Sequence, residues 1–320
     1  MQVDLYGKEA KDAKPFLKWA GGKRQLIEKI ENILPSNIRK SKKIDQYFEP
    51  FLGGGAIFFH LSTNYKIKES FIYDINKELI LVYNTIKNDS DELINELSYI
   101  EENFSKLNDE KRKEFYLNTR KSFNHDLIDF DFNTFSKKHI KRASQTIFLN
   151  KTGFNGLFRL NKKGEFNVPM GRYKNPKICD FKNISNVSKI LKNVKIFNKS
   201  FLDSERFISE KSLVYLDPPY RPLNKTSSFT SYSQNEFNDK EQRELADYFK
   251  RISKKGAYAI LSNSDPKNED PNDEFFDDIY KEFNITRVKA KRFINRNPKK
   301  RGDINEIIVT NYPKKGVNNG

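Results

Sequence analysis

The chain has 320 residues, and its 59 Lys and Arg outnumber its 43 Asp and Glu to give a formal net charge of +16. This positive excess favours a polyanionic partner, although charge alone does not separate nucleic acid from an anionic membrane surface. No stretch of about 18 apolar residues occurs, which excludes a membrane-spanning helix. The polar segment 1–14 lacks the apolar region of a signal peptide, so we expect a cytoplasmic protein.

Cysteine and histidine usage argues against a metal site. Cys179 is the one cysteine, so an intramolecular disulfide and a cysteine-based zinc site are both excluded. His60, His125 and His139 lie far apart and show no metal-ligand spacing, and we interpret them as ordinary core or surface residues. We therefore expect no bound metal.

The N-terminal part of the sequence alternates between helix and strand patterns after an aromatic and glycine-rich segment at 15–23. The expected elements are, in chain order, a helix that has Leu26, Ile27 and Ile30 inside and ends at Pro35, a strand over 44–51, a glycine turn at 53–55, a helix start over 56–61, a strand over 70–73 and a helix over 77–86. A β-α-β-α order of this kind builds parallel sheets.

The composition and the hydrophobic pattern of the sequence change near Ser90. Apolar residues recur at helical spacing, and 150–176 is then rich in glycine and asparagine with little periodicity. We interpret 88–185 as an inserted, mainly helical module that ends in an irregular, basic loop. Strands over 194–197, 213–216, 258–262 and 306–312 and a helix over about 240–252 follow. The main domain is thus expected to comprise 1–87 and 186–320.

Three features lie at predicted strand ends, where open α/β sheets bind their ligands. The first is Phe48-Glu49-Pro50-Phe51-Leu52-Gly53-Gly54-Gly55, whose glycines permit a tight turn and a close approach of the backbone to a ligand. It is not a Walker loop, because no Lys-Ser/Thr pair follows, and it lacks the third glycine of the dinucleotide fingerprint. A glycine turn without a ligand is the alternative interpretation.

The second feature is Tyr73-Asp74-Ile75-Asn76, which ends the next predicted strand. An acidic residue at this place can accept hydrogen bonds from both hydroxyls of a ribose. Its alternative role is to cap the following helix. Together with the glycine turn, Asp74 indicates a nucleoside site.

The third feature is Asp217-Pro218-Pro219-Tyr220, directly after an apolar strand. The two prolines fix the backbone and remove both amide donors, which leaves a carboxylate, carbonyl acceptors and an aromatic face. This set suits a planar group with an exocyclic amine. The amine can donate to Asp217 and to the Pro218 carbonyl while the ring stacks on Tyr220.

These motifs resemble those of a known family. Residues 217–220 together with 48–55 resemble the amino-methyltransferases that use S-adenosylmethionine. The segments 16–23, 150–159 and 164–173 resemble motifs of the Dam-type (GATC-family, D12 class) DNA adenine-N6 methyltransferases. The resemblance extends over most of the chain in the family's order. It implies an α/β, Rossmann-like methyltransferase sheet with an inserted, mainly helical domain that recognises the DNA target.

The resemblance implies S-adenosyl-L-methionine as the cofactor. Trp19 and Lys23 would line its pocket, and Asp74 would hold its ribose. The full set of implied cofactor-binding residues is Trp19, Lys23, Gly53, Gly55, Asp74, Phe201 and Asp217. The alternatives are a core role for the lone tryptophan and a solvated surface charge for Lys23.

The resemblance also implies DNA-binding residues in the loop that follows the helical insert. Phe154 and Leu157 would be apolar wedges, Arg159 suits guanine, and Pro169 suits a thymine methyl group. Phe154 stands where the family often has tyrosine, which keeps an intercalating ring and loses a hydroxyl. The full set is Lys18, Phe154, Leu157, Arg159, Pro169, Arg172, Arg292 and Lys299. A merely polar loop is the alternative.

Residues 286–301 contain eight Lys or Arg and no acidic residue. Between two expected strands, they predict a basic hairpin that follows DNA phosphates, with a solvated charged face as the alternative. The polar segment 221–233 is expected to be a mobile flap over an extruded base.

An adenine stacked in a duplex cannot reach a buried cofactor, so the resemblance implies that the base is flipped out of double-stranded DNA. The expected activity is site-specific methyl transfer to adenine N6, within GATC and linked to restriction-modification. A cognate restriction endonuclease is a possible partner, and a monomer is favoured because single-base chemistry needs no symmetry. Two alternatives stay open: a methyltransferase that acts on RNA adenine or a protein amide, and a non-catalytic DNA-binding protein.

Overall fold

The computed structural model describes residues 13–19, 24–221, 237–291 and 303–313. Within these ranges the chain forms a seven-stranded sheet with the order β3-β2-β1-β4-β5-β7-β6. The strands are β1 (Lys43–Glu49), β2 (Lys66–Tyr73), β3 (Val194–Phe197), β4 (Ser212–Leu216), β5 (Tyr258–Ser264), β6 (Asn284–Lys291) and β7 (Asp303–Thr310). Neighbours among β1 to β5 pair in parallel, and β7 pairs antiparallel with both β5 and β6. The strand order reverses between β1 and β4, the place where such sheets bind ligands.

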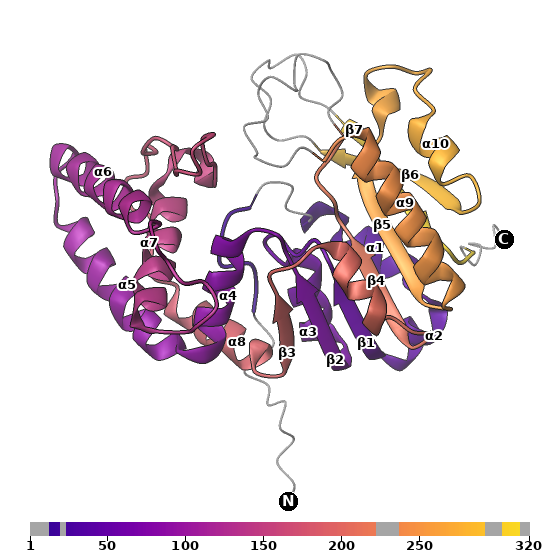
Figure 1. Ribbon diagram of the computed structural model, residues 1–320, viewed down its shortest axis with the longest axis horizontal. Coiled ribbons are helices and arrows are strands. Elements are labelled where there is room, and N and C mark those ends of the chain that lie inside the picture. Colours follow the sequence, from indigo (N-terminus) through magenta and orange to yellow (C-terminus); the bar gives the residue numbers. More distant parts are fainter. Residues whose placement is uncertain (1–12, 20–23, 222–236, 292–302, 314–320) are drawn as a thin grey trace, which may run out of the picture.

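Helices cover both faces of this sheet (Figure 1). Those that precede β3 are η2 (Arg24–Leu26), α1 (Ile27–Ile33), α2 (Ser36–Ser41), α3 (Ala56–Asn64), α4 (Lys77–Asn88), α5 (Ser90–Ser105), α6 (Asp109–His125), α7 (Lys137–Thr152), η3 (Phe154–Gly156) and α8 (Phe181–Leu191). Those that follow β3 are η4 (Phe201–Phe207), α9 (Asp239–Lys254), η5 (Pro266–Asn268) and α10 (Phe275–Ile279). Leu26 and Ile30 are buried and α1 ends just before Pro35, as the sequence predicted.

Side-chain alternation along the strands divides the core into two layers. In β4, Tyr215 belongs to the core that also contains residues of α1, α3 and α4. Its neighbours Val214 and Leu216 belong to the core that contains residues of α9 and α10. The molecule is therefore a helix-sheet-helix sandwich, the α/β class that the sequence predicted.

Helices α5, α6 and α7 extend to one side of the sheet and are drawn in purple and magenta in Figure 1. Their buried residues, such as Leu93, Phe104 and Phe148, belong to the same apolar core as the α4 side of the sheet. A buried ion pair joins the two parts, because Arg142 on α7 donates to both carboxylate oxygens of Glu78 on α4, at 2.8 and 2.5 Å. The expected border between 185 and 186 falls inside α8.

The basic segment at 286–301 is only partly as expected. Residues 284–291 form strand β6, which the sequence analysis missed, so the prediction that this part connects two strands is wrong. Arg287 donates to Asp265 at 2.9 Å and to Asp277 at 2.7 Å, and it therefore stabilises the protein's own surface. The rest of the segment, with Arg292 and Lys299, lies outside the described residues, as do Lys23 and most of the expected flap.

Cysteine and histidine have ordinary environments. Cys179 is buried and its Sγ accepts a hydrogen bond from Ser98. His139 is buried in α7, His60 bonds to Glu31, and His125 is exposed. Within the described ranges, no group of three or more His, Cys, Asp and Glu is arranged for a metal ion. In the same ranges, no helix has both the length and the apolar character to cross a membrane.

Candidate active site

The glycine turn connects β1 to α3 and requires glycine at two positions. Gly53 and Gly55 have φ values of 49° and 68°, in the left-handed region that side chains disfavour. A Cβ on Gly55 would lie 2.7 Å from the hydroxyl of Tyr83, so even alanine does not fit there without movement. The turn is held against the next strand by a hydrogen bond from the Leu52 amide to the Tyr73 carbonyl. The backbone at the end of β1 is thus closely packed and precisely shaped.

Asp74 joins the glycine turn to the end of β2. Its carboxylate accepts one hydrogen bond from the Gly53 amide at 2.9 Å and another from the Asn76 amide at 2.8 Å. Burial raises the pKa of Asp74, and these two amide donors oppose that shift. The alternative that Asp74 caps α4 is wrong, because Asn76 is the cap and accepts from Leu79. Asp74 therefore lies where β1 and β2 end, beside the turn.

Trp19 covers the turn from the N-terminal segment. A Cβ on Gly53 would lie 3.0 Å from the Trp19 ring, which shows how closely the indole approaches the backbone. Trp19 also contacts Phe158, whose ring stacks on the indole with centroids 5.5 Å apart. Trp19 is half-buried and lies between the turn and the 150–176 loop. Trp19 also packs against the apolar core that contains residues of α1, α3 and α4, so its pocket-lining role stays a prediction.

Phe201 lies after β3 in an aromatic cluster. The ring is 6 % exposed and stacks on Phe51 at 5.3 Å, with edges of Phe237 and Tyr248 against it. It is therefore mostly covered by its neighbours. Ile75, which the sequence analysis did not select, is 60 % exposed beside Asp74. An apolar side chain directly after a strand-ending carboxylate is the signal that could have identified it.

Residues 217–220 follow β4 next to the end of β5. Asp217 Oδ1 accepts a hydrogen bond from Ser262 Oγ at 3.2 Å, and Ser262 Oγ is 2.9 Å from the hydroxyl of Tyr215. The Pro219 carbonyl accepts from Gln242 on α9 at 3.1 Å. The hydroxyl of Tyr220 donates to Glu306 on β7 at 3.1 Å. Contacts from β5, α9 and β7 thus fix the motif after its strand.

Glu49, the last residue of β1, is a further carboxyl group that interacts electrostatically with Asp217. It is 2 % exposed and accepts from the Tyr47 hydroxyl at 2.5 Å. Burial raises the pKa of Glu49, and the negative charge of Asp217 raises it further. The sequence analysis selected neither Glu49 nor Ser262 and Glu306, because their role depends on neighbours from other strands. The local sequence gave one indication of a site, because the apolar strand β5 ends in the polar residues 262–264.

The loop at 153–171 is a compact, irregular hairpin. Antiparallel bridges join Gly153 to Met170 and Leu160 to Phe166, and the Phe154 amide donates to the Pro169 carbonyl at 2.8 Å. The hairpin leaves the apolar side chain of Phe154 and the basic side chain of Arg172 exposed. The exposed residues of the predicted set that the structure describes are Lys18, Phe154, Leu157, Pro169 and Arg172.

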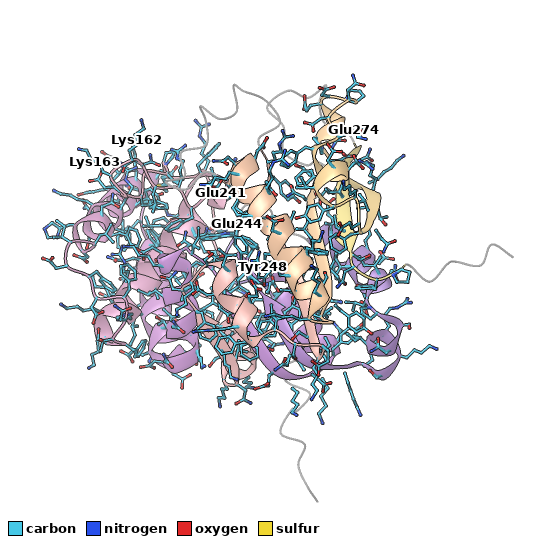
Figure 2. All side chains as sticks on the ribbon, turned by 45° about the vertical axis from the view of Figure 1, so that its right-hand side comes forward. Lys162, Lys163, Glu241, Glu244, Tyr248 and Glu274 are labelled. Carbon is cyan, nitrogen blue, oxygen red and sulfur yellow. The ribbon has the colours of Figure 1, made fainter. Side chains whose placement is uncertain are left out.

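Lys18 contacts residues near the two ends of this loop, and Arg159 is fixed within it. The backbone of Lys18 exchanges two hydrogen bonds with the Asn150 side chain, and its Nζ lies 4.5 Å from the centre of the Tyr173 ring. The Nε of Arg159 donates to Asn167 Oδ1 at 2.7 Å, which orients the guanidinium. The structure thus brings the N-terminal motif and the loop together. Figure 2 shows Lys162 and Lys163 at the outer end of the loop, across the molecule from Glu274.

Comparisons with known proteins assign the molecule to a class of enzyme, the DNA methyltransferases that modify adenine. The family model described as D12 class N6 adenine-specific DNA methyltransferase matches residues 19–294. The type II methyltransferase M.MjaIII of Methanocaldococcus jannaschii is 50% identical, with 94% of this chain and 100% of the relative covered. The type II methyltransferase M1.LlaDCHI of Lactococcus lactis subsp. cremoris is 38% identical, with 97% and 99% covered. The DNA adenine methylase of Escherichia coli K12 is 32% identical, with 95% and 97% covered.

The match extends through β1, β2, β4 and β5, the strands whose ends form the site described above. The chain belongs to the D12 class of N6 adenine-specific DNA methyltransferases. This membership confirms the resemblance on which the sequence analysis relied. It also confirms the Rossmann-like methyltransferase sheet and the enzyme class, and it implies that a methyl donor and DNA are the two substrates.

Proposed function

We propose that this enzyme transfers the methyl group of S-adenosyl-L-methionine to N6 of an adenine flipped out of double-stranded DNA, within GATC. The observation that carries the proposal is the placement of Asp217 and Asp74. Both follow parallel strands, β4 and β2, on either side of β1. They therefore lie at one edge of the sheet, where the strand order reverses and a cofactor and a substrate can meet.

The residues at the end of β1 and β2 fit a nucleoside cofactor. Each oxygen of Asp74 accepts one protein hydrogen bond, and a carboxylate oxygen has capacity for a second donor such as a ribose hydroxyl. Gly53 and Gly55 give the turn its left-handed backbone. Trp19, which contacts Gly53, supplies an aromatic wall, and Ile75 supplies an exposed apolar surface. S-adenosylmethionine supplies a methyl group already activated by its sulfonium charge. The assignment also includes Phe201 and, beyond the described residues, Lys23.

The residues after β4 fit the amine acceptor. An adenine amine is a weak nucleophile because its lone pair is delocalised into the ring. Asp217 and the Pro218 carbonyl accept hydrogen bonds from its two N–H groups and so localise that lone pair towards the methyl carbon. As the N–C bond forms, the sulfur–methyl bond of the sulfonium breaks, and the one proton that the nitrogen loses passes to Asp217. Tyr220, whose hydroxyl is held by Glu306, offers its ring for stacking, and the two prolines keep the backbone rigid. Alignment and electrostatics then supply most of the rate enhancement.

We assign DNA recognition to the helical segment at 88–185 and cofactor and acceptor binding to 1–87 and 186–320. Exposed Phe154 and Leu157 can enter the base stack beside Pro169, and the oriented Arg159 can read guanine. The remaining assigned DNA contacts are Lys18, Arg172, Arg292 and Lys299. The names of the two relatives called type II methyltransferases support a link to restriction-modification and a partner endonuclease. We also propose a monomer that works in the cytoplasm.

Transfer of a tritiated methyl group to synthetic duplexes tests the function directly. We expect label in a GATC duplex, recovery of that label as N6-methyladenine after digestion, and little transfer to the same duplex with the site scrambled. Single-stranded RNA and protein substrates serve as controls for the alternative activities. Equal labelling of the scrambled duplex would contradict the GATC assignment, and label in another base or in RNA would contradict the acceptor.

The Arg159→Ala variant is expected to lose discrimination rather than general affinity. Loss of a bidentate guanine contact costs about 1–3 kcal/mol at one base pair, so the variant should methylate substrates changed at that pair nearly as well as GATC. The measurement is the methylation rate on every single-base variant of the site. Lys163→Ala, at the exposed end of the same loop, is the control, and it should slow all substrates alike. Unchanged discrimination in Arg159→Ala would show that Arg159 does not read a base.

A further inference from the structure

The contact between β4 and β5 places a serine beside the acceptor carboxylate. Tyr215 is opposite Ile260 and Leu216 is opposite Leu261 in the parallel register, so the next pair along the strands is Asp217 and Ser262. Strand alternation puts Tyr215, Asp217 and Ser262 on the same face of the sheet. Tyr215 is 1 % exposed and Ser262 is 0 % exposed. Two buried side chains thus lead in a row to the carboxylate of Asp217, which is only partly buried.

The chemistry of these groups sets the direction of their hydrogen bonds. An ionised carboxylate only accepts, so the Ser262 hydroxyl donates its single proton to Asp217 Oδ1, at 3.2 Å. The Ser262 oxygen then accepts from the Tyr215 hydroxyl, at 2.9 Å. Burial and the charge of Asp217 raise the pKa of Tyr215 well above its ordinary value, which keeps this donor protonated. The row therefore runs from Tyr215 through Ser262 to Asp217.

We propose that Ser262 is a positioning residue for methyl transfer, whose hydroxyl, fixed by Tyr215, holds Oδ1 of Asp217 and directs Oδ2 towards the amine of the target adenine. The proposal rests on the acceptor role given to Asp217 above. Asp217 belongs to a segment fixed by two prolines, but its own side chain rotates. A hydrogen bond to one oxygen restricts that rotation and orients the other oxygen before the base arrives.

The surroundings explain why a neutral donor is useful at this place. Glu49 from β1 and Glu306 from β7 act electrostatically on the same row, together with the Tyr215 hydroxyl from β4. A hydroxyl donates a hydrogen bond to Asp217 without bringing another charge to this group of carboxyl groups. Ser262 can therefore orient Asp217 as a neutral partner.

The experiment measures the single-turnover rate of methyl transfer to a GATC duplex as a function of pH. For Ser262→Ala we expect a fall of about 10- to 100-fold, which corresponds to the loss of one hydrogen bond to a charged group. The acid limb of the profile should move to higher pH, because the carboxylate loses a donor that favours its charged form. Affinities for DNA and for S-adenosylmethionine should stay within about twofold of wild type.

Two further variants separate positioning from a structural role. Ser262→Thr keeps the hydroxyl and should recover the rate to within about threefold of wild type with a normal pH profile. Thr85→Val is the matched control, because the Thr85 hydroxyl on α4 is also 0 % exposed and donates to the Leu81 carbonyl at 2.9 Å. It should lower the melting temperature by a similar amount and leave the rate and the pH profile unchanged. Tyr215→Phe, which keeps Ser262 in place, should slow transfer several-fold.

The outcomes distinguish this proposal from the proposed function. If the wild type transfers methyl groups to adenine but Ser262→Ala reacts at the wild-type rate, the positioning role is wrong and the function stands. Equal slowing of Thr85→Val also overturns the positioning role. If Ser262→Ala does not fold, a wild-type rate and profile in Tyr215→Phe would overturn it as well. A wild type that methylates no adenine refutes the function, and the positioning role with it.

Discussion

Asp217→Ala is expected to lower the rate of methyl transfer by about 10²- to 10⁴-fold while DNA affinity stays within several-fold of wild type. The reason is that a proton acceptor aligned with the reacting amine contributes a factor of this size. DNA affinity comes mostly from lysine and arginine contacts with phosphates, which this change does not touch. Single-turnover transfer of a tritiated methyl group gives the rate, and gel shifts on the same duplex give the affinity.

Asp45→Ala is the matched control for this variant. Asp45 is an exposed carboxylate near the start of β1, at the edge of the sheet opposite to the site. Its loss removes the same charge and should leave both the rate and the affinity near the wild-type values. Residual turnover of Asp217→Ala within tenfold of wild type would contradict the acceptor role of Asp217.

The second large effect is expected on stability. Arg142→Ala should lower the free energy of unfolding by about 3–5 kcal/mol, because it leaves the Glu78 carboxylate buried without its partner. The two side chains are only 2 % and 4 % exposed. The guanidinium also lies 4.1 Å from the centre of the Phe123 ring, which adds a cation-π contact to the loss. Urea unfolding followed by circular dichroism measures the change.

The neighbouring residue provides the comparison. Lys141 pairs with Asp126 at 2.9 Å, but its side chain is 58 % exposed. Lys141→Ala should therefore change the unfolding free energy by less than about 1 kcal/mol. In the double variant Arg142→Met with Glu78→Gln, stability should recover in part, since no charge is left buried alone. A small effect of Arg142→Ala alone would mean that water reaches Glu78 when the arginine is absent.

Much of the sheet could be predicted from the sequence. β1, β3, β4 and β5 have apolar residues with clear ends, and their predicted positions agree with the structure to within a few residues. β6 was not predicted because it contains exposed basic residues, Arg287 and Lys289, and a basic segment equally suggests a DNA-binding loop. Its strand character depends on pairing with β7, in which Arg287 is opposite Ile307, a contact that no local pattern reveals.

Some residues of the candidate site could also be predicted from the sequence, and others could not. Asp74, Asp217 and the glycine turn are recognisable because each stands next to a strand end in the sequence itself. Ser262 and Glu306 are not, because they reach the residues after β4 only through the pairing of β4 with β5 and of β5 with β7. The ion pair of Glu78 with Arg142 joins residues 64 positions apart, and nothing near either residue indicates the other.

The position of β7 in the sheet determines when β6 can join the sheet during synthesis of the chain. β7 is the last described strand in the chain, yet it lies inside the sheet, between β5 and β6. Among the described residues β6 pairs with β7 alone, so it has no neighbour in the sheet until residues 303–310 have left the ribosome. The glycine turn and Asp74 are made more than two hundred residues earlier. The glycine turn and Asp74 are therefore synthesised first, and Glu306, which supports Tyr220, is added last.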